Sequence, residues 1–153
     1  EGVIFTNWTI GEFKKVGVSV FGQDYGFASD ESTLIETNID TTNKIIYLRE
    51  CFYIKHLTTS QIAELNLKHA GNALIVADSA EPRLINELKS KGSNIVASIK
   101  GQDSVNLIKE LNNYCWLDKK TTPIDKFNHL LDAIRYAVTY QLQNPNRGRY
   151  AVS

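Results

Sequence analysis

Near residue 57 the hydrophobic pattern of the chain changes from the period of strands to the period of helices. Residues 32–40 (STLIETNID) and 44–54 (KIIYLRECFYI) are rich in β-branched and aromatic side chains, and the turn-forming residues TTN separate them. These segments predict a β-hairpin. An alternating apolar run from Val18 ends at Asp24, in the Gly-flanked corner QDYG, and predicts an earlier strand. The sheet is therefore expected to begin as an antiparallel meander.

Beyond the hairpin, helical and strand patterns alternate. Residues 58–71 begin with a Thr/Ser cap candidate, carry apolar side chains near helical spacing and stop at Gly71, which predicts a helix. A short apolar strand ends at Asp78, and the next helix starts at Pro82 and closes at Gly92. The remaining predicted elements are a strand within residues 93–101, a helix over 104–113 and a long helix over 124–143.

Strand-helix-strand units imply parallel pairing in the second part of the sheet. The predicted order is βββ-α-β-α-β-α-α. We therefore expect an α/β fold in which three antiparallel strands lead into parallel strands and helices flank the mixed sheet. This is the arrangement of ribonuclease-H-like folds.

The composition excludes several classes of function. With 153 residues the chain fits one domain, and no apolar run approaches the ~20 residues that cross a bilayer. Basic and acidic residues balance at 17 each, so nucleic-acid binding would need a local patch. The sequence has no P-loop motif, no GxGxxG and no serine nucleophile elbow. His56 and His69 lack companions at ligand spacing, which argues against structural zinc.

Two further observations concern the origin of the chain. Cys51 and Cys115 lie far apart in apolar contexts, which favours buried, reduced thiols and a cytosolic protein. The chain begins at Glu1 and contains no methionine, so we expect it to be a piece of a longer polypeptide.

Two acids end predicted strands. Asp24 ends the first strand and Asp78 the fourth, so in a sheet where these strands are neighbours their carboxylates would meet at one edge. Carboxylates are ligands that Mg²⁺ and Mn²⁺ prefer, and a pair of such ions can hydrolyse a phosphodiester. Asp132 is the candidate for a third acid. The alternative for Asp24 and Asp78 is that they only form turns or helix caps.

The last predicted helix allows two interpretations. Asp132 and His129 share one helical face, where a histidine could position water or transfer a proton. A solvated polar face explains the same pattern, with the apolar stripe turned to the core. That stripe consists of Phe127, Leu130, Leu131, Ile134 and Val138, and the opposite face of Asp125, His129, Asp132 and Tyr136.

Several cations are candidates for contacts with a nucleic-acid backbone. Lys100 lies at a predicted strand end beside Gly101 and could reach a phosphate; the alternative is an exposed turn lysine. The other candidates, which could also form a solvated charge cluster, are Lys119, Lys120, Arg135, Arg147 and Arg149.

Segments spread over residues 4–138 carry a family resemblance: IFTNW, GQDYGFASDEST, VADSAEPRLINELKSKG, ASIKGQDSVNLIKEL and PIDKFNHLLDAIRYA, in that order. Together they resemble the C-terminal nuclease domain of the large terminase subunit of tailed bacteriophages. The resemblance implies a lead-in arm at 1–16 from a preceding ATPase domain, a ribonuclease-H-like nuclease domain at 17–143 and a flexible tail at 144–153.

Carried over by position, the resemblance implies that Asp24 bridges two Mg²⁺ or Mn²⁺ ions and that Asp78 and Asp132 complete their coordination. His129 falls where the family has a histidine before the last acid. Asp30 also matches a family acid, and we interpret it as a loop former near the site. If Asp132 is a metal ligand, the polar face of the last helix lies against the end of the sheet instead of facing water.

The implied function is a metal-dependent endonuclease that cuts concatemeric viral double-stranded DNA during genome packaging, in the cytoplasm of the infected bacterium. Its implied partners are DNA, the ATPase domain of the full-length chain, the portal and the small terminase subunit. One alternative is a nuclease of the junction-resolvase or transposase type on the same fold. Another is a non-catalytic module that docks DNA or the portal.

Overall fold

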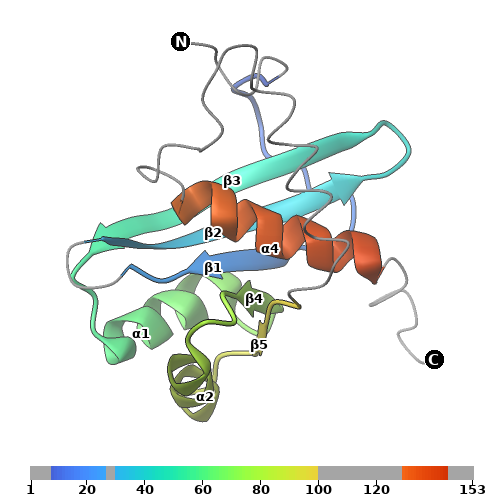
Figure 1. The fold of residues 1–153 in the computed structure, drawn as a ribbon. Helices are drawn as coiled ribbons and strands as arrows, with labels where there is room; N and C mark the ends of the chain where they lie inside the picture. The colour runs from blue at the N-terminus through green and yellow to red at the C-terminus, as the bar shows by residue number, and fades with distance from the viewer. Residues whose placement is uncertain (1–7, 27–29, 100–128, 145–153) are drawn as a thin grey trace, which may run out of the picture.

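The computed structural model describes residues 8–26, 30–99 and 129–144, and its centre is a five-stranded mixed sheet with strand order β3-β2-β1-β4-β5 (Figure 1). The strands are β1 Val20–Asp24, β2 Glu31–Asp40, β3 Ile45–Lys55, β4 Ile75–Ala77 and β5 Ile95–Ala97. The helices are α1 Thr59–Ala70, α2 Pro82–Ser90 and α4 His129–Gln143.

Strand pairing confirms the predicted mixed topology. Strand β2 pairs antiparallel with β1 and β3, whereas β4 pairs parallel with β1 and β5. In the register of the central strand, Asp24 lies opposite Thr33 of β2, and Gln23 lies opposite Ala77 of β4. The carboxyl ends of β1 and β4 therefore meet at one edge of the sheet, as the sequence predicted for Asp24 and Asp78.

The helix boundaries follow from local chemistry. Helix α1 begins after Thr58, which forms a capping box with Gln61, and it ends at Gly71 with φ 55°. Helix α2 has Pro82 in its first turn, where the missing N–H costs nothing. The predicted helix over 104–113 and the start of the last predicted helix lie outside the described residues.

Helices cover both faces of the sheet (Figure 1). On the face of α1 and α2, Phe21 and Leu34 pack against Ile62 and Leu88. On the opposite face α4 lies across β1 and β2. There the core consists of Val20, Val76, Tyr136, Ala137 and Tyr140.

Helix α4 lies unusually close to the central strand. A Cβ atom on Gly22 would be 1.7 Å from the carbonyl oxygen of Ala133, so only glycine fits there. Two threonines of β2 hold the helix at both ends. The hydroxyl of Thr33 donates to the carbonyl of His129 at 3.4 Å, and the side chain of Gln141 donates to the hydroxyl of Thr37. The close backbone contact at Gly22 and these two hydrogen bonds thus fix the position of α4 on the sheet.

The orientation of α4 turns part of its polar face toward the sheet, with His129 and Asp132 half-buried, although Val138 of the apolar stripe is buried too. Ala133, Tyr136, Ala137 and Tyr140 are buried against the sheet, whereas Leu131 is 42% exposed. Small alanines allow the close approach to β1, and the tyrosine rings supply the buried apolar surface. The expectation that followed from the resemblance is therefore correct for the described part of this helix. Phe127 and Asp125 lie outside it.

The described part of the lead-in arm has no helix or strand, but the sheet holds it. Asn38, fully buried on β2, accepts hydrogen bonds from the backbone N–H groups of Val16 and Gly17 at 3.0 and 3.1 Å. The guanidinium of Arg49 lies 4.9 Å from the ring centroid of Phe13. Residues 13–19 therefore follow a defined path over β2 and β3.

Cys51 forms no disulfide and is half-buried at the edge of the core, less buried than the sequence suggested; Cys115 lies outside the described residues. In the described part of the chain, the search for a helix long and apolar enough to cross a membrane found none.

Candidate functional site

The end of β1 delivers a carboxylate to the face covered by α4. Along β1, Val20 and Gly22 face this helix, and Asp24 follows in the same alternation. The Asp24 residue is only 6% exposed. Its Oδ2 lies 2.6 Å from Nδ1 of His129, the first residue of α4. Thr33, the register partner of Asp24, binds the His129 carbonyl and so fixes the histidine beside the acid.

Asp132 lies one turn further along α4. Its Oδ1 is 2.9 Å from Nη2 of Arg135, and the two side chains are 23% and 29% exposed. The Arg135 guanidinium also stacks on the neighbouring Tyr136 ring, 5.1 Å from the centroid, and donates to the Tyr136 hydroxyl at 3.4 Å. Arg135, which the sequence suggested as a DNA contact, is therefore an ion-pair partner of Asp132 in this structure.

Asp78 follows β4 directly. Its backbone N–H donates to the carbonyl of Gln23 at 3.2 Å, which extends the pairing of β4 with β1 by one residue. Its Oδ1 accepts from the N–H of Ala80 at 3.2 Å, so Asp78 does form a turn before α2. The same pairing makes Asp78 a neighbour of Asp24 across the two strand ends.

Negative charge is concentrated at this site. The pKa of Asp24 is raised to about 6, mainly because the carboxyl is buried. The contact with His129 lowers it, and the charges of Asp132 and Asp78 raise it further. Burial and the same acids also raise the pKa of Tyr136 well above its ordinary value. Asp132 and Asp78 are therefore close enough to Asp24 for their charges to act on its carboxyl group.

The donor chemistry fits a divalent cation. A buried carboxylate with other acids near it, such as Asp24, is stabilised by a nearby positive ion, and carboxylate oxygens suit Mg²⁺ and Mn²⁺. The spacing is not that of a closed metal site, because no three His, Cys, Asp or Glu side chains among residues 8–26, 30–99 and 129–144 are grouped tightly enough to hold an ion. Instead Asp24 contacts His129, and Asp132 contacts Arg135.

Sequence reasoning missed a polar pair behind the site. Gln23 and Asn66 of α1 are fully buried and exchange two side-chain hydrogen bonds, at 2.7 and 3.0 Å. The pair joins α1 to β1 next to Asp24. No local pattern signals a partner 43 residues away. Gly22, by contrast, had a signal, since a glycine inside a strand often marks a close backbone approach.

The remaining predicted residues are Asp30 and five cations. Asp30 is exposed just before β2. The cations that lie outside the described residues are Lys100, Lys119, Lys120, Arg147 and Arg149.

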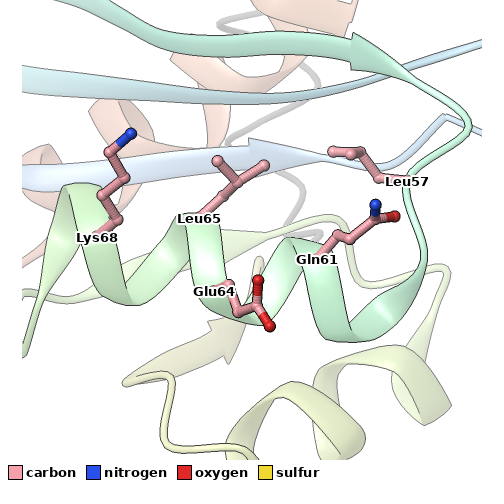
Figure 2. A pocket seen from close by; sticks show the side chains of 5 residues that line it. All are labelled: Leu57, Gln61, Glu64, Leu65 and Lys68. Atoms are coloured by element: carbon pink, nitrogen blue, oxygen red, sulfur yellow. The ribbon is translucent and has the colours of Figure 1, made fainter.

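A surface hollow of about 280 Å³ lies over α1 (Figure 2). Because α1 and α4 cover opposite faces of the sheet, this hollow is separate from the acids. Its lining residues are Leu57, Gln61, Glu64, Leu65 and Lys68.

Comparisons with known proteins identify the family. Residues 24–107 match the family model described as the terminase RNAseH-like domain. The large terminase subunit of Bacillus phage SPP1 is 30% identical over 166 residues; the match covers 90% of this chain and 38% of that protein, so the chain spans less than half of its length.

Solved structures agree. The nuclease domain of the SPP1 large terminase, a structure with bound Mn, superposes with a TM-score of 0.64 at 28% identity, covering 82% of this chain and 87% of that one. The nuclease domain of the P22 large terminase has the same fold, with a TM-score of 0.64 at 12% identity over 82% of this chain and 81% of that one. The chain belongs to the terminase RNaseH-like domain family.

Proposed function

We propose that this chain is a divalent-metal-dependent DNA endonuclease that cuts viral double-stranded DNA during genome packaging. One observation carries the proposal: Asp24, buried at the end of the central strand, lies near enough to Asp78 and Asp132 for their charges to raise its pKa. Ionised acids gathered in this way favour the binding of a divalent cation. The bound Mn in the related SPP1 nuclease domain supports a metal as that cation.

In this proposal Asp24, Asp78 and Asp132 would hold two ions, Mg²⁺ or Mn²⁺. When bound, such ions supply Lewis-acid stabilisation of charge on the attacking and leaving oxygens of a phosphodiester. The acids also keep their own places through protein contacts. Asp24 is held by His129, and Asp78 by its turn with Ala80.

His129 has two tasks in this proposal. Its Nδ1 fixes the orientation of the Asp24 carboxylate. With the proton on Nδ1, the acceptor nitrogen is Nε2, which takes a proton from the attacking water. The water oxygen bonds to phosphorus, the bond from phosphorus to the 3′ oxygen breaks, and that oxygen receives a proton from a solvent water. The products are 5′-phosphate and 3′-hydroxyl ends.

Within a full-length terminase, we propose that the domain acts beside an ATPase domain, together with the portal and small terminase subunit, in the cytoplasm of the infected host. Lys100, Lys119, Lys120, Arg147 and Arg149 are the proposed contacts to the DNA backbone.

The test is conversion of supercoiled plasmid to nicked and linear forms with Mn²⁺ or Mg²⁺, with EDTA as the metal-free control. We expect cleavage by the parent protein and none by Asp132→Asn. Asp40→Asn is the matched control, because it makes the same change at the far end of β2, where an amide oxygen can still accept the turn hydrogen bonds from Thr42 and Asn43. Equal cleavage by parent and Asp132→Asn would remove Asp132 from the site.

Two other outcomes would favour the alternatives. Metal-independent DNA binding without cleavage would favour the docking module. Cleavage of four-way junctions in preference to linear duplex would favour a junction-resolvase-like nuclease.

A further inference from the structure

Arg135 has a role at the site that the proposed function leaves unexplained. Its Nη2 is 2.9 Å from Asp132 Oδ1, and its guanidinium rests on the Tyr136 ring. The guanidinium is thus supported on one side by the ring and bonded on another to an acid that we propose as a metal ligand. The side chain is 29% exposed, so the same group also borders solvent at the site.

This position makes Arg135 a competitor of a cation at Asp132. Arginine stays protonated in proteins, so its charge persists when a dication approaches. The ion and the guanidinium then repel each other while both are attracted to one carboxylate. Binding of a divalent ion to Asp132 must therefore weaken the bond between Arg135 and Asp132.

A guanidinium that is released from Asp132 can bind a phosphate group of DNA instead. Its planar set of N–H donors matches the oxygens of a phosphate and can bind two of them at once. DNA bound for cleavage brings backbone phosphates to the edge of the sheet where Asp132 lies. Because Arg135 follows Asp132 by one helical turn, a small movement of its side chain suffices to exchange carboxylate for phosphate.

We infer that Arg135 is an exchangeable counter-ion: Asp132 holds it in the metal-free protein, and a divalent ion at Asp132 frees it to bind a phosphate of the DNA backbone. The inference rests on the proposed function, because it needs a metal at Asp132 and DNA as substrate. Its consequence is that metal and DNA bind cooperatively through one arginine. By linkage, each ligand then strengthens binding of the other by the same factor.

The experiment measures both affinities without relying on cleavage. Isothermal titration calorimetry gives the affinity of Mn²⁺ in the absence of DNA. Fluorescence anisotropy gives the affinity of a labelled duplex of about 20 base pairs with EDTA and with Ca²⁺, an ion that also takes oxygen ligands. Gel electrophoresis checks that the duplex stays intact.

In the parent protein we expect Ca²⁺ to raise duplex affinity on the order of tenfold. In Arg135→Gln this gain should fall to about twofold or less, while Mn²⁺ without DNA should bind several-fold more tightly, because no guanidinium opposes it. Arg135→Met should behave in the same way while keeping an apolar side chain on the Tyr136 ring, so it replaces Arg135→Gln if that variant misfolds. Lys89→Gln, in the last turn of α2, is the matched loss of one positive charge and should change neither quantity.

The results separate this inference from the proposed function. If the parent binds no Mn²⁺, both ideas are wrong. If Asp132→Asn binds Mn²⁺ as tightly as the parent, no metal is held at Asp132, so this inference is wrong and Asp132 is removed from the proposed site. If Asp132→Asn binds Mn²⁺ more weakly but Arg135→Gln keeps the full Ca²⁺-dependent gain in duplex affinity, only the role of Arg135 is wrong. An unchanged duplex affinity of the parent with Ca²⁺ would overturn the inference in the same way.

Discussion

His129 Nδ1 lies 2.6 Å from Asp24 Oδ2, which joins the first residue of α4 to the last residue of β1 across 105 residues of sequence. The contact exists because α4 rests on the backbone of β1 at Gly22 and because Thr33 holds the His129 carbonyl. The geometry of the acids therefore depends on the contact between Gly22 of β1 and Ala133 of α4, neither of which takes part in the proposed chemistry.

Gly22→Ala should damage the site more than the fold. The added Cβ would meet the Ala133 carbonyl at 1.7 Å, and a backbone carbonyl cannot turn aside as a flexible side chain can, so α4 must shift. We expect a loss of about 1–3 kcal/mol in the free energy of unfolding, measured with urea. Plasmid cleavage should fall at least tenfold in protein that is still folded, since His129 and Asp132 move with the helix.

Gly17→Ala is the control, because its Cβ would meet no atom within 4 Å. Its stability and cleavage should equal those of the parent. Parental cleavage by a folded Gly22→Ala protein would show that the close contact does not set the geometry of the acids.

Asp24→Asn should stabilise the metal-free protein. The folded-state pKa of Asp24 is about 6, above the ordinary 3.8, so the folded protein binds more protons than the unfolded chain between these values. The free energy of unfolding therefore falls as pH rises through this window. At 1.36 kcal/mol per unit of pKa, the charged form costs about 3 kcal/mol at pH 8, and the neutral amide avoids most of this cost.

The measurement is urea unfolding in EDTA at pH 8 and near pH 4. We expect the Asp24→Asn variant to be more stable than the parent at pH 8 by up to about 3 kcal/mol, with the difference vanishing near pH 4. Saturating Mn²⁺ should reduce the difference, because only the parent gains stability from an ion held at the site. A variant that is less stable than the parent at pH 8 would contradict this account of Asp24.

The order of elements and the place of Asp24 were predictable because both are local signals. The β-branched and aromatic residues of β2 and β3, the cap at Thr58 and Pro82 in the first turn of α2 each act over a few residues. The meeting of Asp24 and Asp78 then follows from parallel strands sharing an edge.

The packing of α4 was not decided by its own sequence pattern. By hydrophobicity alone, a stripe with Leu131 competes well with a face of alanine and tyrosine for the core. The surface of β1 decides how α4 packs. Because Gly22 has no side chain, the backbone at Ala133 can approach the strand, and the space left is too small for a large side chain. The ion pair between Asp132 and Arg135 depends on this orientation of α4. The sequence alone made Arg135 look like an exposed charge, because it does not show how the helix packs.

The effect of Glu36→Gln on the free energy of unfolding should depend on pH in the opposite sense to that predicted for Asp24→Asn. Burial would raise the pKa of Glu36, but hydrogen bonds from Ser19, Arg49 and Lys15 outweigh it and hold the pKa below its ordinary value. Such a carboxylate adds stability above pH 4.5, and this stability is lost as pH falls through the lower folded-state pKa.

The variant should therefore lose about 1–3 kcal/mol of unfolding free energy at pH 7, and less in acid, by urea unfolding. It should also release the arm. Limited proteolysis should cleave near Lys14 and Lys15 faster in Glu36→Gln than in the parent, since Glu36 binds the side chains of Lys15 and Ser19. Unchanged proteolysis would mean that the other contacts, those of Asn38 with Val16 and Gly17 and of Arg49 with Phe13, are enough to hold this segment.

The Gln23–Asn66 pair should show strong coupling in a double-mutant cycle. Gln23→Met leaves the buried Asn66 amide without its partner, and Asn66→Leu does the same to Gln23, so each change should cost about 1–3 kcal/mol in unfolding free energy. The double variant replaces both amides with apolar groups of similar size and should lose less than the sum of the single changes, with a coupling energy of about 1–3 kcal/mol. Additive losses would show that the two hydrogen bonds contribute little.

The same variants should differ in plasmid cleavage, because Gln23 precedes Asp24. Each single variant leaves one amide unpaired and should cleave more slowly than the double variant, in which the strand end is again packed without an unsatisfied amide.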